Sequence, residues 1–148
     1  MQAIVINWWA VLIAAVVSMV IGSIWFGPLF GKKWMEITGM ANCSEEERKK
    51  MQKAAMPLYA LQFVLSGLTS YILAHFIISS SAFFGMTGAK AGMICALWIW
   101  LGFIMPTIGG GAMWSGKPKK LAWSMFWINV SYNAVLYIVI GAILGGWR

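Results

Sequence analysis

The side chains that could do chemistry in the apolar parts of this chain are polar but uncharged, and they gather in two segments. Helical spacing places three of them on one face of a helix over 58–78, and three on one face of a helix over 121–145. They are Gln62, Ser66, Thr69, Asn129, Tyr132 and Asn133, and Tyr137 continues the second face. Amides surrounded by lipid need hydrogen-bonding partners. Either the two faces hydrogen-bond each other and fix the packing, or they line a polar pathway or a pocket for a small ligand.

His75 is the only histidine, and it lies in the outer part of the 58–78 segment. Its imidazole could titrate near physiological pH and act as a proton relay or gate. Alternatively, it is a histidine hydrogen-bonded near a membrane surface. One histidine without carboxylate or thiolate neighbours is a poor metal cage. We therefore expect no metal and no cofactor.

The sequence offers no catalytic constellation. It has no aspartate, and every glutamate lies in the stretch 34–53, which we expect on the opposite side of the membrane from His75. A serine–histidine–carboxylate set therefore cannot form at one depth. The glycine run 109–111 lacks the Lys-Ser/Thr of a phosphate-binding loop, and it is expected to end a helix. We predict that the protein is not an enzyme.

The elements that position these side chains are helices in a bilayer. Of the 148 residues, 61% are hydrophobic and only 10% are charged, whereas soluble domains carry about 25% charged residues. A chain this apolar could not cover a water-facing surface, and a helix needs about 20 residues to cross a membrane. The fold class is therefore all-α, a single four-transmembrane-helix bundle that contacts the lipid bilayer. Its predicted spans are residues 8–27, 58–78, 89–108 and 121–145.

The second span has a short cytoplasmic extension in front of it. Ser44 and Glu47 have the spacing of a capping box, so a solvated helix begins near Ser44 and runs on into the second span. Two glutamates of this helix each precede a lysine by four residues, an order that favours ion pairs. The charge cluster is either a solvated helical face or a docking surface for a protein partner over residues 35–56.

The basic residues are distributed unevenly between the two sides of the predicted bundle. The net charge is +7, and nine of the 11 Lys and Arg residues lie in the first and third connections. They are Lys32, Lys33, Arg48, Lys49, Lys50, Lys53, Lys117, Lys119 and Lys120. Only Lys90 and Arg148 lie on the other side. By the positive-inside rule the basic connections face the cytoplasm, and both termini lie outside it. A nucleic-acid role is not expected, because a basic patch needs a soluble face to present it.

Small residues recur at every fourth position along all four spans, for example Ala10, Ala14, Ser18 and Gly22 in the first. Such stripes let membrane helices approach closely. They serve packing within one bundle or, in part, an interface between copies, and we expect a homo-oligomer. A weak likeness between the segments that begin at Gly22 and Gly102 also indicates a two-plus-two duplication.

Motifs at the two ends of the chain carry a family likeness. The first is Asn7-Trp8-Trp9, followed by Gly22-Ser-Ile-Trp25-Phe-Gly-Pro28-Leu-Phe-Gly31-Lys-Lys-Trp34. The second is Asn129-Val-Ser-Tyr132, followed by a glycine-rich stretch that ends at Trp147. With these motifs the chain resembles the domain-of-unknown-function 1761 family of prokaryotic membrane proteins. The resemblance implies a four-helix protein of the cell (inner) membrane, and it implies no activity.

Two functional hypotheses remain from the sequence. The leading one is a homo-oligomeric channel or carrier for a small solute or ion, because an uncharged polar face on the fourth span faces a partner on the second. No Asp, Glu, Lys or Arg lies near the centre of a span, which argues against proton-coupled export. The alternative is a non-transporting accessory or scaffold protein that docks a partner through its cytoplasmic loop.

Overall fold

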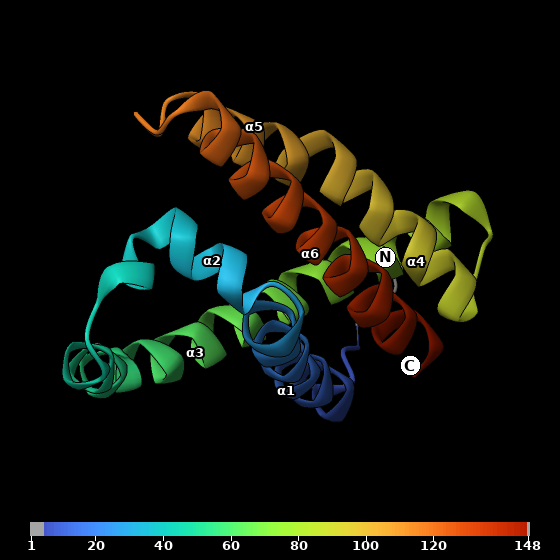
Figure 1. Ribbon diagram of the computed structural model, residues 1–148. Coiled ribbons are helices and arrows are strands. Elements are labelled where there is room, and N and C mark those ends of the chain that lie inside the picture. Colours follow the sequence, from blue (N-terminus) through green and yellow to red (C-terminus); the bar gives the residue numbers. More distant parts are fainter. Residues whose placement is uncertain (1–4, 148) are drawn as a thin grey trace.

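Every element in the part of the chain that the structure describes, residues 5–147, is a helix (Figure 1). The structure is a computed structural model. Arg148, which entered the charge count above, lies outside the described residues. In chain order the elements are α1 (Trp8–Ile24), η1 (Trp25–Leu29), α2 (Gly31–Thr38), η2 (Met40–Asn42), α3 (Glu45–Phe84), α4 (Gly88–Ile99), η3 (Trp100–Ile104), α5 (Met105–Met113) and α6 (Lys119–Gly146).

Four continuous helical stretches are long and apolar enough to cross a membrane, as predicted for a membrane protein. They are Trp8–Leu29, Glu45–Phe84, Gly88–Met113 and Lys119–Gly146, with mean hydropathies between 1.6 and 2.3. At 1.5 Å per residue, the 40 residues of α3 extend for about 60 Å, roughly twice the thickness of the hydrocarbon core. The first part of α3 therefore projects beyond the bilayer, which matches the predicted extension of the second span.

The basic residues gather at one end of the bundle, here called the basic end, where α2, the start of α3 and the α5–α6 connection lie. α1 begins and α6 ends at the opposite end, called the terminal end (Figure 1). Ser44 caps α3 as predicted, since its hydroxyl accepts from the Glu47 N–H while the Glu47 carboxylate accepts from the Ser44 N–H at 2.8 Å. α2 was not predicted; it is an amphipathic helix of about two turns that ends at Gly39, whose φ of 79° suits glycine.

The predicted ion pairs Glu45–Lys49 and Glu46–Lys50 do not form. The salt bridge found among the described residues joins Lys33 to Glu36 at 2.6 Å. An ion pair between two exposed side chains four residues apart is hardly more stable than the two hydrated side chains, so these pairs are not held together. The charged side chains of both predicted pairs are exposed, and a docking role for this cluster stays a prediction.

Small residues form the closest helix contacts. α4 and α6 touch backbone to backbone, because a Cβ on Gly145 would lie 2.7 Å from the Gly88 carbonyl oxygen and 2.8 Å from the Gly92 Cα. On the other side of the bundle, Ala10 and Ala14 of α1 are buried in the core that also contains Ala74 of α3. The stripes therefore serve packing within the chain, and they no longer provide an argument for an oligomer.

The third span runs further than predicted. The glycines 109–111 lie inside α5 instead of ending a helix, and the span continues to Met113. A Cβ at Gly109 would lie 3.5 Å from the Phe126 ring, an ordinary contact, so Gly109 packs against α6 without being required there. The first and third spans each contain a five-residue π-helix, η1 and η3, and each π-helix opens with Trp-x-Gly.

The two halves of the chain repeat one plan. In each, an apolar helix passes through a π-helix into a short helix and is followed by one long helix that runs back. The halves are α1-η1-α2-α3 and α4-η3-α5-α6. This arrangement fits the two-plus-two duplication that the sequence indicated weakly, and the Trp-x-Gly openings give a better register for it than the segments beginning at Gly22 and Gly102 do.

Candidate functional site

The predicted polar residues of α3 and α6 form their hydrogen bonds within their own helices. The Gln62 side-chain amide donates to the Ser66 hydroxyl at 3.4 Å. The Asn129 amide donates to the Met125 carbonyl at 2.8 Å, and the Asn133 amide donates to the Asn129 carbonyl at 2.9 Å. In the described chain these amides therefore do not bond across the two spans. A carbonyl four residues back is within reach of any helical asparagine, whereas a partner on another helix needs two faces at short distance.

Tyr132 belongs to a junction between α6 and α1. Its ring lies 5.0 Å from the Phe26 ring, and its hydroxyl would be 3.3 Å from a Cβ on Gly22. Beside it, the Trp25 indole N–H donates to the Ile128 carbonyl at 3.1 Å. The two sequence motifs from opposite ends of the chain thus meet here, and they hold the first span against the fourth.

The remaining motif residues near this junction shape the bend that follows α1. Pro28 lies inside η1, and Gly31 begins α2 with its Cα close to the Phe26 carbonyl. The Trp34 ring lies 4.7 Å from the Phe26 ring. These contacts fold α2 back against η1, so the motif fixes the direction in which the chain leaves the first span.

His75 lies towards the terminal end in an aromatic stack. The rings of Trp8 and Tyr71 are 5.3 Å apart and parallel, and the His75 ring meets Tyr71 edge-on at 4.7 Å. Asn7 caps α1 beside this stack, and Trp147 follows the last residue of α6. His75 therefore packs with aromatic rings and does not adjoin the other predicted polar residues.

One hollow about half-way along the spans opens on the outer face of the bundle and is lined by polar side chains of two spans. This middle groove has a cavity volume of about 250 Å³ and lies between α3, α4 and α6. Thr69 of α3 and Tyr137 of α6 line it with apolar residues, among them Ile99 of α4. Thr69 and Tyr137 thus line one hollow from the second and fourth spans, whereas the amides do not line it.

Two buried polar atoms next to the middle groove lack a hydrogen-bond partner in the described chain. They are the Ser70 hydroxyl and the Trp100 indole N–H, which directly follow the groove residues Thr69 and Ile99. Ser70 is fully buried, at 0% exposure. An unsatisfied buried donor costs about 1–3 kcal/mol, so such groups are informative.

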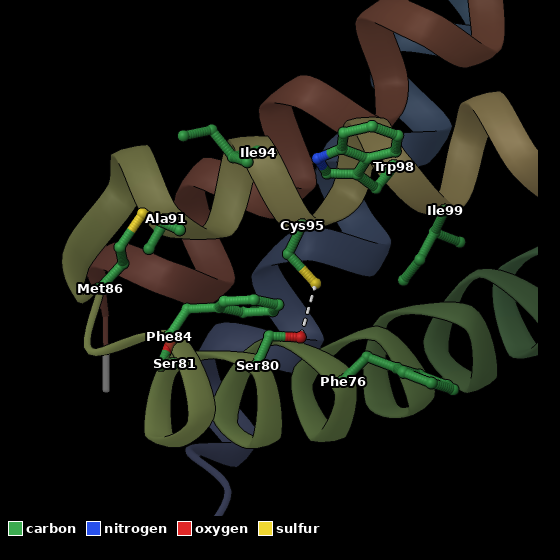
Figure 2. A pocket seen from close by; sticks show the side chains of 10 residues that line it. All are labelled: Phe76, Ser80, Ser81, Phe84, Met86, Ala91, Ile94, Cys95, Trp98 and Ile99. Atoms are coloured by element: carbon green, nitrogen blue, oxygen red, sulfur yellow. Dashed lines mark hydrogen bonds between the residues drawn. The ribbon is translucent and has the colours of Figure 1, made fainter.

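A second hollow lies at the terminal end of the bundle, between α4 and the last turns of α3 (Figure 2). It measures about 330 Å³ and is walled by apolar side chains such as Phe76, Phe84 and Trp98. The Ser80 hydroxyl and the Cys95 thiol, 3.5 Å apart, form a polar spot on its wall. Within residues 5–147 no group of three His, Cys, Asp or Glu side chains could hold a metal ion.

Two larger grooves lie at the basic end, and sequence reasoning missed both. The first basic groove, about 780 Å³, lies between η1, α2 and the start of α3. The second basic groove, about 640 Å³, lies between α5 and the start of α6. Family-motif residues from Phe26 to Trp34 line the first, together with Arg48 and Tyr59 of α3. The motif pointed to this region, but only the folding of α2 beside α3 creates the groove.

A family model described as "Protein of unknown function (DUF1761)" matches residues 9–145, nearly the whole chain. The chain belongs to the DUF1761 family. The match spans both motif regions of this DUF1761 protein, including the Trp25–Tyr132 junction that joins them. No curated protein and no solved structure matches the chain.

Proposed function

We propose that this DUF1761 protein is a membrane channel or carrier for a small uncharged solute or a dehydrated ion, with the middle groove as its central site. The observation that carries the proposal is the pair of buried polar atoms without a partner, on Ser70 and Trp100, each one residue after a lining residue of the groove that Thr69 and Tyr137 also line. In lipid, polar groups gathered in this way need water or a solute to satisfy them.

The chemistry of the groove supports neutral cargo. Its lining residues include no charged side chain, and the polar contributions are the hydroxyls of Thr69 and Tyr137. Hydroxyls both donate and accept, so they can replace part of the hydration shell of a small polar molecule. A volume of about 250 Å³ has room for one small solute or several waters.

The π-helix η3 supports a carrier in which the backbone moves. It begins at Trp100, directly after the groove residue Ile99. π-helices interrupt the regular backbone ladder and are frequent at functional sites. A shift of register in η3 would move the Trp100 indole relative to the groove, so binding and access would be linked.

Flux through the purified protein in liposomes tests this proposal. Water, glycerol, urea, sodium and potassium are compared with empty vesicles, and the protein is expected to raise the flux of at least one. Thr69→Val keeps the shape and removes the hydroxyl, so that flux should fall about threefold to tenfold, the worth of one hydrogen bond. Thr107→Val, an exposed site on α5 away from the groove, is the matched control. No flux above empty vesicles for any of these solutes would overturn the proposal.

An accessory or scaffold role is the second candidate. Hydrogen bonds that join the segments of the basic end favour it. The Arg48 guanidinium donates to the carbonyls of Cys43 and Ala41 at 3.1 and 3.3 Å, and the Lys117 ammonium donates to the Ile37 carbonyl at 2.8 Å. These bonds hold residues 35–56 in one shape, as a docking surface requires. Photocrosslinking from Cys43 in native membranes should then capture one specific protein, and labelling no stronger than that of random membrane proteins would count against it.

Orientation, self-association and the absence of catalysis complete the proposal. From the charge bias we propose that the basic end faces the cytoplasm and that the termini lie outside it. His75 lies towards the terminal end while the glutamates lie at the basic end, which supports a role without acid–base catalysis. Self-association stays a prediction, to be checked by the mass of the protein in detergent.

A further inference from the structure

The two basic grooves occupy equivalent places in the two halves of the chain. Each lies just beyond a π-helix that opens with Trp-x-Gly, between the short helix that follows and the start of the next long helix. The first is formed by α2 and α3, and the second by α5 and α6. Because the same plan builds both grooves, we expect both to bind the same kind of molecule.

Both grooves combine an apolar wall with positive charge. Lys32 and Arg48 line the first, Lys117 and Lys119 line the second, and no acidic residue lines either. Much of the remaining wall is apolar, including Leu29 in the first groove and residues from Met105 to Phe126 in the second. The fitting ligand therefore has an anionic head and a hydrocarbon body.

Two of the four basic side chains that line the grooves already donate hydrogen bonds to the protein itself. Arg48 donates to carbonyls of the η2 turn, and Lys117 donates to the end of α2. Lys32 and Lys119 are exposed, and each lines its groove. These two ammonium groups are the ones placed to meet an external anion.

The aromatic residues of both grooves favour a membrane lipid over a soluble anion as the ligand. Trp34 and Tyr59 line the first groove and Trp123 lines the second, and such residues collect where headgroups meet hydrocarbon. We propose that each basic groove binds one anionic phospholipid, with its phosphate at Lys32 or Lys119 and an acyl chain along the apolar wall. The proposal does not depend on transport, since lipid retention and solute flux are measured separately.

Native mass spectrometry of the purified protein in detergent tests the proposal, with phosphatidylglycerol and phosphatidylcholine as probes. The protein should retain up to two phosphatidylglycerol molecules and bind phosphatidylcholine more weakly. Lys32→Gln and Lys119→Gln should each weaken one of the two binding steps about fivefold, the worth of one lysine near an anionic surface. The control is Lys49→Gln with Lys53→Gln, exposed cations of α3 that line neither groove, and it should leave both steps unchanged.

Filling the first groove provides a test that leaves charge unchanged. A Cβ on Gly27 would meet no atom within 4 Å, and Gly27 lines the groove, so Gly27→Leu places a side chain where the acyl chain would lie. It should remove one of the two phosphatidylglycerol molecules. Equal retention of the two lipids, or a control variant as damaging as Lys32→Gln, would overturn the proposal. If Gly27→Leu does not fold, the lysine comparison still decides.

Discussion

The contact between α4 and α6 should tolerate no added methyl group at Gly92. A Cβ there would overlap the Gly141 carbonyl oxygen and lie 2.9 Å from both the Gly141 carbonyl carbon and the Gly145 Cα, where ordinary contacts begin at 3.4 Å. All three are backbone atoms, which cannot turn aside as a side chain can. Because the carbonyl oxygen is the closest of the three, the two helices in Gly92→Ala must separate by about 1 Å.

The loss of stability expected in Gly92→Ala follows from how α4 and α6 pack. α4 and α6 make the most extensive helix contact in the described chain, and packing rather than hydrophobic force holds membrane helices together. A gap of 0.5–1 Å removes about a quarter to a half of the dispersion energy of each contact. Overpacking of this kind costs about 1–3 kcal/mol, and the backbone clash places Gly92→Ala near the upper end, about 3 kcal/mol.

The matched control is Gly67→Ala in α3. A Cβ at Gly67 would meet nothing within 4 Å, so the substitution only reduces the freedom of the unfolded chain. It should stabilise the protein by about 0.4–1 kcal/mol. Unfolding of both variants is measured in the same detergent, by heat with a thiol-reactive dye that reports the two cysteines and by titration with a denaturing detergent.

The two substitutions should therefore change stability in opposite directions. If Gly92→Ala were as stable as the unaltered protein, the close approach of α4 and α6 would be wrong. If Gly67→Ala were equally damaging, loss of glycine itself, and not the clash, would explain both results.

Three further predictions concern the contact of Trp25 with α6, the cap of α3 and the bond between Lys117 and α2. Trp25→Phe removes the indole bond to the α6 carbonyl and should lower the free energy of unfolding by about 0.5–1.5 kcal/mol in the same assay; no change would mean that this bond is not formed in the membrane. Hydrogen bonds from the Ser44 backbone and hydroxyl hold the pKa of Glu47 below its ordinary value of 4.5, so the cap stabilises α3 above that value and is lost as pH falls through the lowered pKa. Hydrogen exchange at the start of α3 should accelerate there in the unaltered protein but not in Glu47→Gln, and identical pH profiles would refute this. Lys117→Met removes the ammonium bond to the end of α2, so exchange in α2 should rise while that in α4 stays constant; unchanged α2 protection would show that the bond does not restrain it.

The candidate site was predictable only in part. The sequence singled out Thr69 by its helical spacing, and Tyr137 continued the corresponding face of the fourth span; both side chains line the middle groove. For the amides of Asn129 and Asn133 the sequence left open bonds to the second span or a place along a polar pathway, and the structure shows bonds to carbonyls of their own helix. Spacing tells which residues share a face, but not the rotation of that face relative to a neighbouring helix.

The sequence by itself determined that the chain is helical, that four helices are long and apolar enough to span a membrane, and that a capped polar helix extends the second of them. These properties depend on composition and on neighbours within one helix, which the order of residues specifies directly. Only the tertiary structure decided that α2 folds back beside α3, that glycines 109–111 continue a helix, and that hollows form at the middle and at the basic end. Those outcomes depend on which backbones approach closely, as at Gly92 and Gly145, and that is set by the packing of residues far apart in the chain.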